Sequence, residues 1–352
     1  MTTTSTPSSP SPRRSTCPSW SEGRPTRPSR WWCACSRAGR ARRSGFTDGD
    51  PLATARAAQL RGTFVTIDEK WRQAISDPLA TAEGPWLTGK VAAIAGGGLS
   101  GPEGGVGFGI AWLCARSGAN VAVLDRDREA GERAVELIRE LGVDAEWIEL
   151  DIMDDASCQT AVAAAKERFG RIDVVADSIG GGSVESILTV SEEEFDATMT
   201  LNFKSAWMLI KHVAPAMEDG GAIVTVSSGA TEGRGPGMAY TFAKHALEKL
   251  TIGASQTLAS RRIRVNCVRV GMIWGAFAAK GMTEDRRELR RKSVAMQIEG
   301  NSWDIASAGF FLLTEQARWV SGQVFSVDGG GMSAAARGNV GSAGSPDPGK
   351  GE

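Results

Sequence analysis

The sequence contains very little of two residue types that often carry protons in enzymes. Among its 352 residues there are two histidines, His212 and His245, and one tyrosine, Tyr240. Zinc sites built from several histidines and histidine-based catalytic triads are therefore disfavoured. No apolar run reaches the roughly 18 residues that a transmembrane helix needs, so no membrane span is predicted. An acid–base enzyme of this composition has few proton carriers to choose from.

The net charge and the cysteines limit which classes of partner and which cellular compartment are expected. The formal net charge is −1, which gives no argument for a nucleic-acid or membrane partner. Of the six cysteines, Cys114, Cys158 and Cys267 occur singly in apolar segments, and the other three lie near the N-terminus. This pattern is typical of reduced thiols in a cytoplasmic protein rather than of a disulfide framework. No group of residues has the spacing of metal ligands, so the sequence predicts no metal site.

Composition divides the chain into a central domain and two tails. Residues 1–60 are predicted to be a disordered or non-native tail, because they are rich in Ser, Pro and Arg and show no hydrophobic period. An Arg-rich transit peptide is the alternative interpretation of this segment. Residues 61–86 are expected to be a connector, 87–332 the folded domain, and 333–352 a flexible tail rich in Gly and Ser.

Apolar strands alternate with helices throughout the central domain. The expected strands are Lys90–Ala95, Val121–Asp125, Ala145–Leu150, Ile172–Ala176, Ala222–Val226, Arg264–Val268 and Gln323–Val327. Helices are expected between them, including Gly107–Ser117, Glu192–Met217 and Tyr240–Ala259. Continuous apolar strands of this kind are buried on both faces. The pattern therefore predicts an α/β fold, a single domain with a doubly wound parallel sheet in three layers.

A glycine-rich loop follows the first expected strand and leads into a helix. Glycines allow a backbone to approach a pyrophosphate closely, and a helix N-terminus supplies free N–H groups. Asp125 ends the second strand, where a carboxylate can accept both ribose hydroxyls of NAD and repel the 2′-phosphate of NADP. We therefore expect NAD as cofactor, with NADP less favoured although Arg126 and Arg128 lie nearby. The loop residues expected to contact it are Gly96, Gly105, Val106 and Gly107.

Tyr240 and Lys244 lie one turn apart on the same face of an expected helix. A free phenol has a pKa near 10 and is a poor base at neutral pH. A nearby ammonium, together with a cationic nicotinamide, favours the phenolate and lowers this pKa. Ser227 and Ser228 end the preceding strand, where either hydroxyl could hold a substrate oxygen beside Tyr240. We favour Ser228, with Ser227 as the alternative.

With these motifs, the chain resembles the short-chain dehydrogenase/reductase family, in its compact branch, over about Gly89–Gly331. The run Arg264-Val265-Asn266 is similar to the strand before the family's substrate loop. The resemblance implies a Rossmann-type fold and a catalytic tetrad of Asn202, Ser228, Tyr240 and Lys244. It also implies cofactor contacts from Asp151, Ile152, Ser178, Gly180, Tyr240, Lys244 and Ile273.

Several segments depart from the family pattern, among them the following three. The loop between Gly96 and Gly105 is longer than the family's. The family's Asn-Asn-Ala-Gly motif is replaced by Asp177-Ser178-Ile179-Gly180, which adds a negative charge to the site. A threonine that often contacts the nicotinamide carboxamide is missing near Gly275.

The resemblance implies an NAD(P)-dependent oxidoreductase that interconverts a secondary alcohol and a ketone, with Tyr240 as general acid or base. The alternatives are a non-catalytic dinucleotide-binding sensor or scaffold and a sugar-nucleotide epimerase. No C-terminal substrate domain is recognisable, which disfavours the epimerase.

Substrate and assembly are less clearly indicated. Trp274 and Phe277 favour an apolar or alicyclic small-molecule substrate beneath a lid formed by Gly275–Gly300. The basic run Arg286–Lys292 is interpreted as a solvated helix face, with an anchor for an acidic substrate group as the alternative. By resemblance, a homotetramer or homodimer is expected through the helices of Asn202 and Tyr240.

Overall fold

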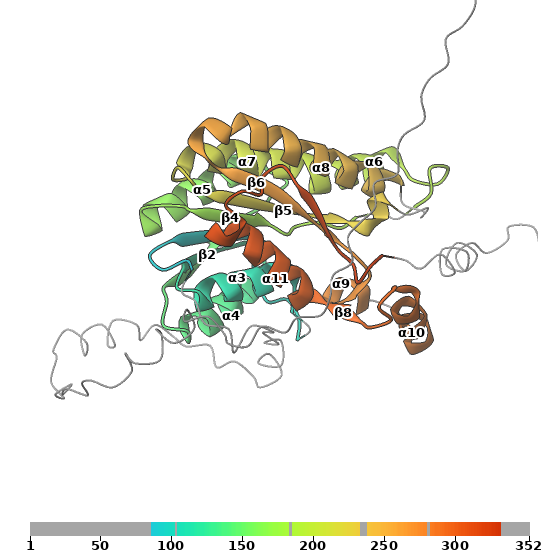
Figure 1. The fold of residues 1–352 in the computed structure, drawn as a ribbon. Helices are drawn as coiled ribbons and strands as arrows, with labels where there is room; N and C mark the ends of the chain where they lie inside the picture. The colour runs from blue at the N-terminus through green and yellow to red at the C-terminus, as the bar shows by residue number, and fades with distance from the viewer. Residues whose placement is uncertain (1–85, 103, 183–184, 233–237, 280–281, 332–352) are drawn as a thin grey trace, which may run out of the picture. The chain divides into compact units, whose positions relative to one another are not determined.

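The computed structural model describes residues 86–102, 104–182, 185–232, 238–279 and 282–331 (Figure 1). The predicted N-terminal tail and nearly all of the connector lie outside the described residues, as does the predicted C-terminal tail. None of the helices in the described part of the chain is long and apolar enough to cross a membrane.

A seven-stranded parallel sheet forms the middle layer of the domain. Its strand order is β3-β2-β1-β4-β5-β6-β9, and every neighbouring pair is parallel. The strands are β1 (Val91–Ala95), β2 (Asn120–Asp125), β3 (Ala145–Glu149), β4 (Val174–Asp177), β5 (Ala222–Ser228), β6 (Arg264–Val270) and β9 (Val324–Val327). The predicted doubly wound parallel sheet is confirmed. The winding direction changes between β1 and β4, and ligands of such sheets bind at the carboxyl ends of the strands beside this change.

Helices cover both faces of the sheet (Figure 1). On one face lie α3 (Val106–Arg116), α4 (Arg128–Arg139) and α11 (Ser302–Leu313). On the other lie α5 (Asp155–Phe169), α7 (Ser205–Ala216) and α8 (Met238–Thr257). All five residues of β1 are buried, because this central strand is covered by both layers. This burial explains why the strands read as continuous apolar runs rather than as alternating ones.

The long helix predicted over Glu192–Met217 is interrupted by a wider turn. It consists of α6 (Glu192–Met199), a π-helical turn, η1 (Thr200–Lys204), and α7. A single π-helical turn displaces the helix face that follows it, and such turns are frequent at functional sites. Asn202, which the family resemblance places in the catalytic tetrad, lies inside this turn and is buried.

The segment predicted to be a lid contains structure that the sequence did not indicate. A two-stranded parallel sheet joins β7 (Ile273–Trp274) to β8 (Gly300–Asn301), with α9 (Ala276–Ala279) and α10 (Glu284–Ser293) between them. The basic run forms most of α10. Ion pairs join Arg287 to Glu299, and Arg291 and Lys292 to Glu288. These pairs favour the interpretation as a solvated helix face.

Candidate active site

The glycines after β1 allow three chain segments to meet. Gly96 has a φ of +73°, and a Cβ there would lie 2.8 Å from Ser178 Oγ. A Cβ on Gly107 would overlap the carbonyl oxygen of Gly96 and the Ser178 hydroxyl. Ser178 Oγ in turn donates to the carbonyl of Ala95 at 2.9 Å. The end of β1, the first turn of α3 and the end of β4 are therefore packed too closely for any side chain at the two glycines.

The N-terminus of α3 has the properties of an anion site. Its N-cap is Gly105, which supplies no side-chain hydrogen bond, and its first turn contains no acidic residue. Nothing lies within 4 Å of the position that a Cβ on Gly105 would occupy. Gly105 thus borders open space directly before the first N–H groups of the helix, which start at Val106, and before the positive end of the helix dipole. This cradle fits the diphosphate of a dinucleotide.

Asp125 is held in place by two backbone groups at the end of β2. Its Oδ2 accepts the N–H of Gly98 at 3.0 Å, and its Oδ1 accepts the N–H of Asp127 at 3.1 Å. Each carboxylate oxygen keeps capacity for a further hydrogen bond, so both remain available to ribose hydroxyls. A Cβ on Gly98 would lie 2.6 Å from Oδ2. Sequence reasoning missed Gly98, although the three consecutive glycines that begin the loop were a signal for it.

The longer glycine-rich loop is anchored to α4. Leu99 is fully buried, and its N–H donates to the carbonyl of Ala130 at 2.9 Å. The carbonyl of Leu99 accepts from Arg133 Nε at 3.1 Å. The start of the loop is therefore held in place at the carboxyl end of β1, beside Asp125.

Asp151 and Ile152, two of the expected cofactor contacts, follow the end of β3. Asp151 is exposed, and its Oδ1 accepts the N–H of Met153 at 3.0 Å. Ile152 is 4% exposed and packs in the core beneath the sheet, so its side chain faces the core. Beside them is a hollow of about 510 Å³ at the carboxyl ends of β2 and β4, lined by Arg126, Met153 and Gly182 among others.

Tyr240 and Lys244 lie in α8, above the end of β5. A hydrogen bond with Ser228 acts to lower the pKa of Tyr240. Lys244 is 3% exposed, its Nζ donates to the carbonyl of Val226 at 2.9 Å, and it lies 5.8 Å from the centre of the Tyr240 ring. Ser227, the alternative serine, instead donates its hydroxyl to Glu248 at 2.8 Å. Of the two serines, Ser228 is thus the one in contact with Tyr240.

Asn202 ties the π-helical turn to the segment after β4. Its Nδ2 donates to the carbonyls of Gly181 and Thr198, at 2.6 and 2.8 Å, and its Oδ1 accepts the N–H of Gly181. A Cβ on Gly180 would lie 2.9 Å from Asn202 Oδ1 and 2.8 Å from Lys244 Nζ. The segment after β4 thus brings Gly180, Asn202 and Lys244 together.

Comparison with known proteins identifies this arrangement. Residues 101–332 match a family model described as Enoyl-(Acyl carrier protein) reductase. The 7alpha-hydroxysteroid dehydrogenase of Escherichia coli K12 is 31% identical over 249 residues, 70% of this chain and 95% of that protein. The structure of a short-chain type dehydrogenase/reductase from Mycobacterium ulcerans is 28% identical, with a TM-score of 0.64 over 71% of this chain and 94% of that one.

The chain belongs to the short-chain dehydrogenase/reductase family. It is therefore an oxidoreductase that acts on CH–OH groups with an NAD(P) cofactor. A further similar structure is 7 alpha-hydroxysteroid dehydrogenase complexed with NADH and 7-oxo glycochenodeoxycholic acid. It is 31% identical, with a TM-score of 0.66 over 71% of this chain and 96% of that one.

Burial dominates the ionisation of Tyr240 and Lys244 in this dehydrogenase/reductase. Burial raises the pKa of Tyr240, and the hydrogen bond with Ser228 opposes this only in part. Burial also lowers the pKa of Lys244, and the charge of Asp177 opposes that change. The lowered tyrosine pKa that the sequence predicted, with lysine and nicotinamide acting together, is therefore not a property of the protein alone.

The negative charge that the sequence places at Asp177 depends on the pH. Burial at the end of β4 raises the pKa of this carboxyl to about 6, although Lys244 and a hydrogen bond from the Ile179 N–H oppose the change. Near pH 6 the added charge is therefore partly neutralised by a proton. The asparagine that the family has at this position is an uncharged amide and does not titrate.

The lid side of the site contains Ile273 and Trp274 in β7. Ile273 is half-buried, and its carbonyl accepts from Arg290 at 3.3 Å. The Arg287 guanidinium lies 4.0 Å from the centre of the Trp274 ring, so one face of this indole is covered by a cation. The side chain of Phe277 lies outside the described residues.

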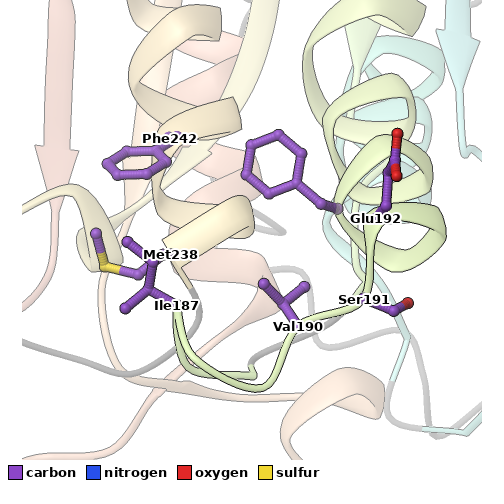
Figure 2. A pocket seen from close by; sticks show the side chains of 7 residues that line it. Ile187, Val190, Ser191, Glu192, Met238 and Phe242 are labelled. Atoms are coloured by element: carbon purple, nitrogen blue, oxygen red, sulfur yellow. The ribbon is translucent and has the colours of Figure 1, made fainter.

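An apolar hollow of about 370 Å³ lies between the start of α8 and the segment before α6. Figure 2 shows Ile187, Val190, Met238 and Phe242 among the side chains that line it. Met238 and Phe242 are four residues apart and share one face of α8, whereas Tyr240 lies on another. The hollow is therefore beside Tyr240 rather than around it.

Proposed function

We propose that the chain interconverts a secondary alcohol and a ketone by hydride transfer, with NAD as the preferred cofactor. The observation that carries this proposal is the contact between the Tyr240 hydroxyl and Ser228 at the end of β5, with Lys244 buried one turn further along α8. A phenol and a hydroxyl that converge in this way can hold one substrate oxygen between them.

Each residue of the tetrad has a proposed role. Tyr240 takes the proton of the substrate hydroxyl in oxidation and returns it in reduction. Ser228 orients the substrate oxygen, and Lys244 favours the phenolate by its charge. Asn202 holds the segment after β4 against Lys244. When bound, the nicotinamide supplies the hydride acceptor or donor.

The proposed cofactor site rests on backbone groups. Gly96, Gly105 and Gly107, with Val106, would hold the diphosphate at the N-terminus of α3. Asp125 supports NAD over NADP, because its two oxygens suit ribose hydroxyls and its charge repels a 2′-phosphate. Asp151, Ile152, Ser178, Gly180 and Ile273 complete the proposed contacts, Ile152 through its backbone because its side chain is buried.

We further propose an apolar or alicyclic substrate and a homo-oligomeric assembly in the cytoplasm. The 7-oxo glycochenodeoxycholic acid complexed with a similar dehydrogenase supports an alicyclic ketone. Trp207 on α7 and Phe242 on α8, which are 45% and 44% exposed, support an interface through these two helices. Three free, buried cysteines among the described residues support a reducing compartment.

Tyr240→Phe tests the catalytic proposal. It should lower turnover of secondary alcohols with NAD by about 100- to 10,000-fold, because it removes the proposed proton carrier. The measurement is the absorbance of NADH with a panel of alicyclic alcohols and ketones. Trp319→Phe, an exchange at a 92% exposed side chain, is the matched aromatic control. Retained turnover in Tyr240→Phe would refute the mechanism, and tight NAD binding without turnover in the unmodified protein would favour the sensor alternative.

A further inference from the structure

A buried carboxylate that the proposed reaction does not use lies one turn beyond Lys244. Glu248 is 6% exposed and faces the sheet from α8. Burial acts to raise its pKa, but hydrogen bonds from Arg269 and Ser227 outweigh burial and hold this pKa below its usual value. Glu248 is therefore ionised at neutral pH.

Arg269 of β6 binds this carboxylate with two hydrogen bonds. Its Nε donates to Oε1 at 2.9 Å and its Nη2 donates to Oε2 at 2.8 Å. Its remaining nitrogen pairs with the exposed Glu232 and lies 3.4 Å from Ser326 Oγ in β9. A bidentate pair of this kind fixes the orientation as well as the position of the carboxylate.

One oxygen of the Glu248 carboxylate, Oε1, also contacts residues on both sides of Ser228 in the chain. Before it in the chain, Ser227 Oγ donates to Glu248 Oε1 at 2.8 Å. After it, Thr231 Oγ1 in the turn η2 (Gly229–Thr231) lies 3.3 Å from Glu248 Oε1 and 2.9 Å from the carbonyl of Ser228. An ion pair that served only to join α8 to β6 would need neither of these contacts.

We propose that Glu248, oriented by Arg269, is a positioning residue that holds Ser228 in contact with Tyr240. The carboxylate does not touch the reacting atoms. It fixes the end of β5 and the turn that follows, and so it fixes the backbone that carries the serine hydroxyl. The inference rests on the proposed function, since it assumes that the contact between Ser228 and Tyr240 matters for turnover.

The single tyrosine makes this inference measurable without a substrate. Because Tyr240 is the only tyrosine in the chain, the ultraviolet difference absorbance of phenolate formation reports its pKa directly. The hydrogen bond with Ser228 lowers this pKa. Loosening Ser228 should therefore raise the pKa of Tyr240.

Two variants remove the support in different ways. Glu248→Gln keeps the shape of the side chain but removes the charge that Arg269 and the two hydroxyls recognise. The double variant Ser227→Ala/Thr231→Val removes only the two hydroxyl contacts, changes no charge, and keeps the test available if Glu248→Gln does not fold. Both should raise the pKa of Tyr240 and lower kcat about tenfold, with a smaller change in KM.

Glu232→Gln is the matched control. It also removes a carboxylate partner of Arg269, but Glu232 is exposed and, among the described residues, its carboxylate makes no hydrogen bond with Ser227 or Thr231. The Tyr240 titration and kcat should stay unchanged in this variant. An unchanged titration in the folded double variant, or an equal shift in Glu232→Gln, would overturn the inference. Such a failure leaves the proposed function standing, whereas retained turnover in Tyr240→Phe would remove the function whatever the titration shows.

Discussion

At the ends of β1 and β2, backbone groups shape the expected cofactor site and hold the carboxylate of Asp125, whereas at the ends of β4 and β5 the site is made of buried side chains. Gly96 and Gly107 shape the first region by having no side chain, and backbone N–H groups hold Asp125. In the second region, Asp177 and Lys244 are both buried and affect each other's ionisation.

The two regions should therefore respond differently to mutation. A backbone site fails when a side chain is added, because atoms then overlap. Removing a charge from a site of buried charges changes the stability of the protein. Stability falls when the charge had a partner of opposite sign or hydrogen bonds, and it rises when the charge was buried without them. The predictions below test this difference, from the largest expected effect to the smallest.

Asp177→Asn should stabilise the protein at neutral pH. The pKa of this carboxyl is raised from 3.8 to about 6, so its ionised form is disfavoured in the folded state. The penalty is absent below pH 3.8, grows as the pH rises toward 6, and is complete above that. Removing it should gain up to about 3 kcal/mol in the free energy of unfolding at pH 7 and nothing in strong acid. Urea unfolding at several pH values measures this difference in the free energy of unfolding.

The same variant should also change the pH dependence of turnover. Because the charge of Asp177 opposes the lowering of the Lys244 pKa by burial, Asp177→Asn should move the alkaline limb of kcat/KM to lower pH.

Asp173→Asn is the matched control and should change the stability in the opposite direction. Asp173 lies just before β4, the strand that ends at Asp177. Burial acts to raise the pKa of Asp173, but hydrogen bonds from Arg171 and from the Val91 N–H outweigh it and hold the pKa below its ordinary value. The ionised form is therefore favoured, and the variant should lose about 1–3 kcal/mol at neutral pH. This loss should disappear as the pH falls through the pKa of the folded state. Changes of the same sign in both variants would contradict this account of the catalytic region.

Gly107→Ala should disrupt the cofactor region. The added methyl group would overlap the carbonyl oxygen of Gly96 and the hydroxyl of Ser178, so β1, β4 or α3 must move. Overpacking of this kind costs about 1–3 kcal/mol, and where the NAD-bound state bears this cost the affinity for NAD should fall about 5- to 150-fold. Titration calorimetry with NAD measures the change.

Gly253→Ala is the matched helical control. Gly253 lies in α8, and nothing is within 4 Å of the position its Cβ would take. This variant should gain about 0.5–1 kcal/mol in stability and bind NAD as before. If both variants bind NAD normally, the closely packed glycines do not define the site.

The backbone region was easier to predict from sequence, for a physical reason. A backbone that must approach closely or adopt a positive φ requires glycine, so Gly96 and Gly107 are visible in the sequence itself. Asp125 was predictable because it ends a strand that a short apolar run had already located. The sheet was predictable for a similar reason, since burial on both faces leaves continuous apolar strands.

Apart from Asn202, which the family resemblance supplied, the side-chain region was predicted only where its residues are close in sequence. Tyr240 and Lys244 are one turn apart, so their shared face follows from helix geometry. Glu248 and Arg269 are 21 residues apart on different elements, and only the packing of α8 against β6 pairs them. The raised pKa of Asp177 depends on burial at a strand end, where a strand pattern does not distinguish a buried acid from an exposed one. The strands β7 and β8 have two residues each and left no pattern to detect.

Asp125→Asn should have a smaller effect than Asp177→Asn or Gly107→Ala, because it changes one contact of a site held mainly by the backbone. An amide presents one oxygen where the carboxylate presents two, so it can accept from Gly98 or from Asp127 but not from both. Affinity for NAD should fall about tenfold, and discrimination against NADP should fall with it, since the repulsion of the 2′-phosphate is lost.

Asp127→Asn separates this effect from a general loss of negative charge. Asp127 caps α4, where its Oδ1 accepts the N–H of Ala130 at 3.0 Å, and asparagine is an equally good cap. Both variants remove one charge from the same turn, but only Asp125 is proposed to face the ribose. KM values for NAD and NADP should therefore change in Asp125→Asn alone. An equal change in both variants would mean that cofactor choice follows the overall charge of this turn, and the backbone contacts to Asp125 would then serve only to close the loop.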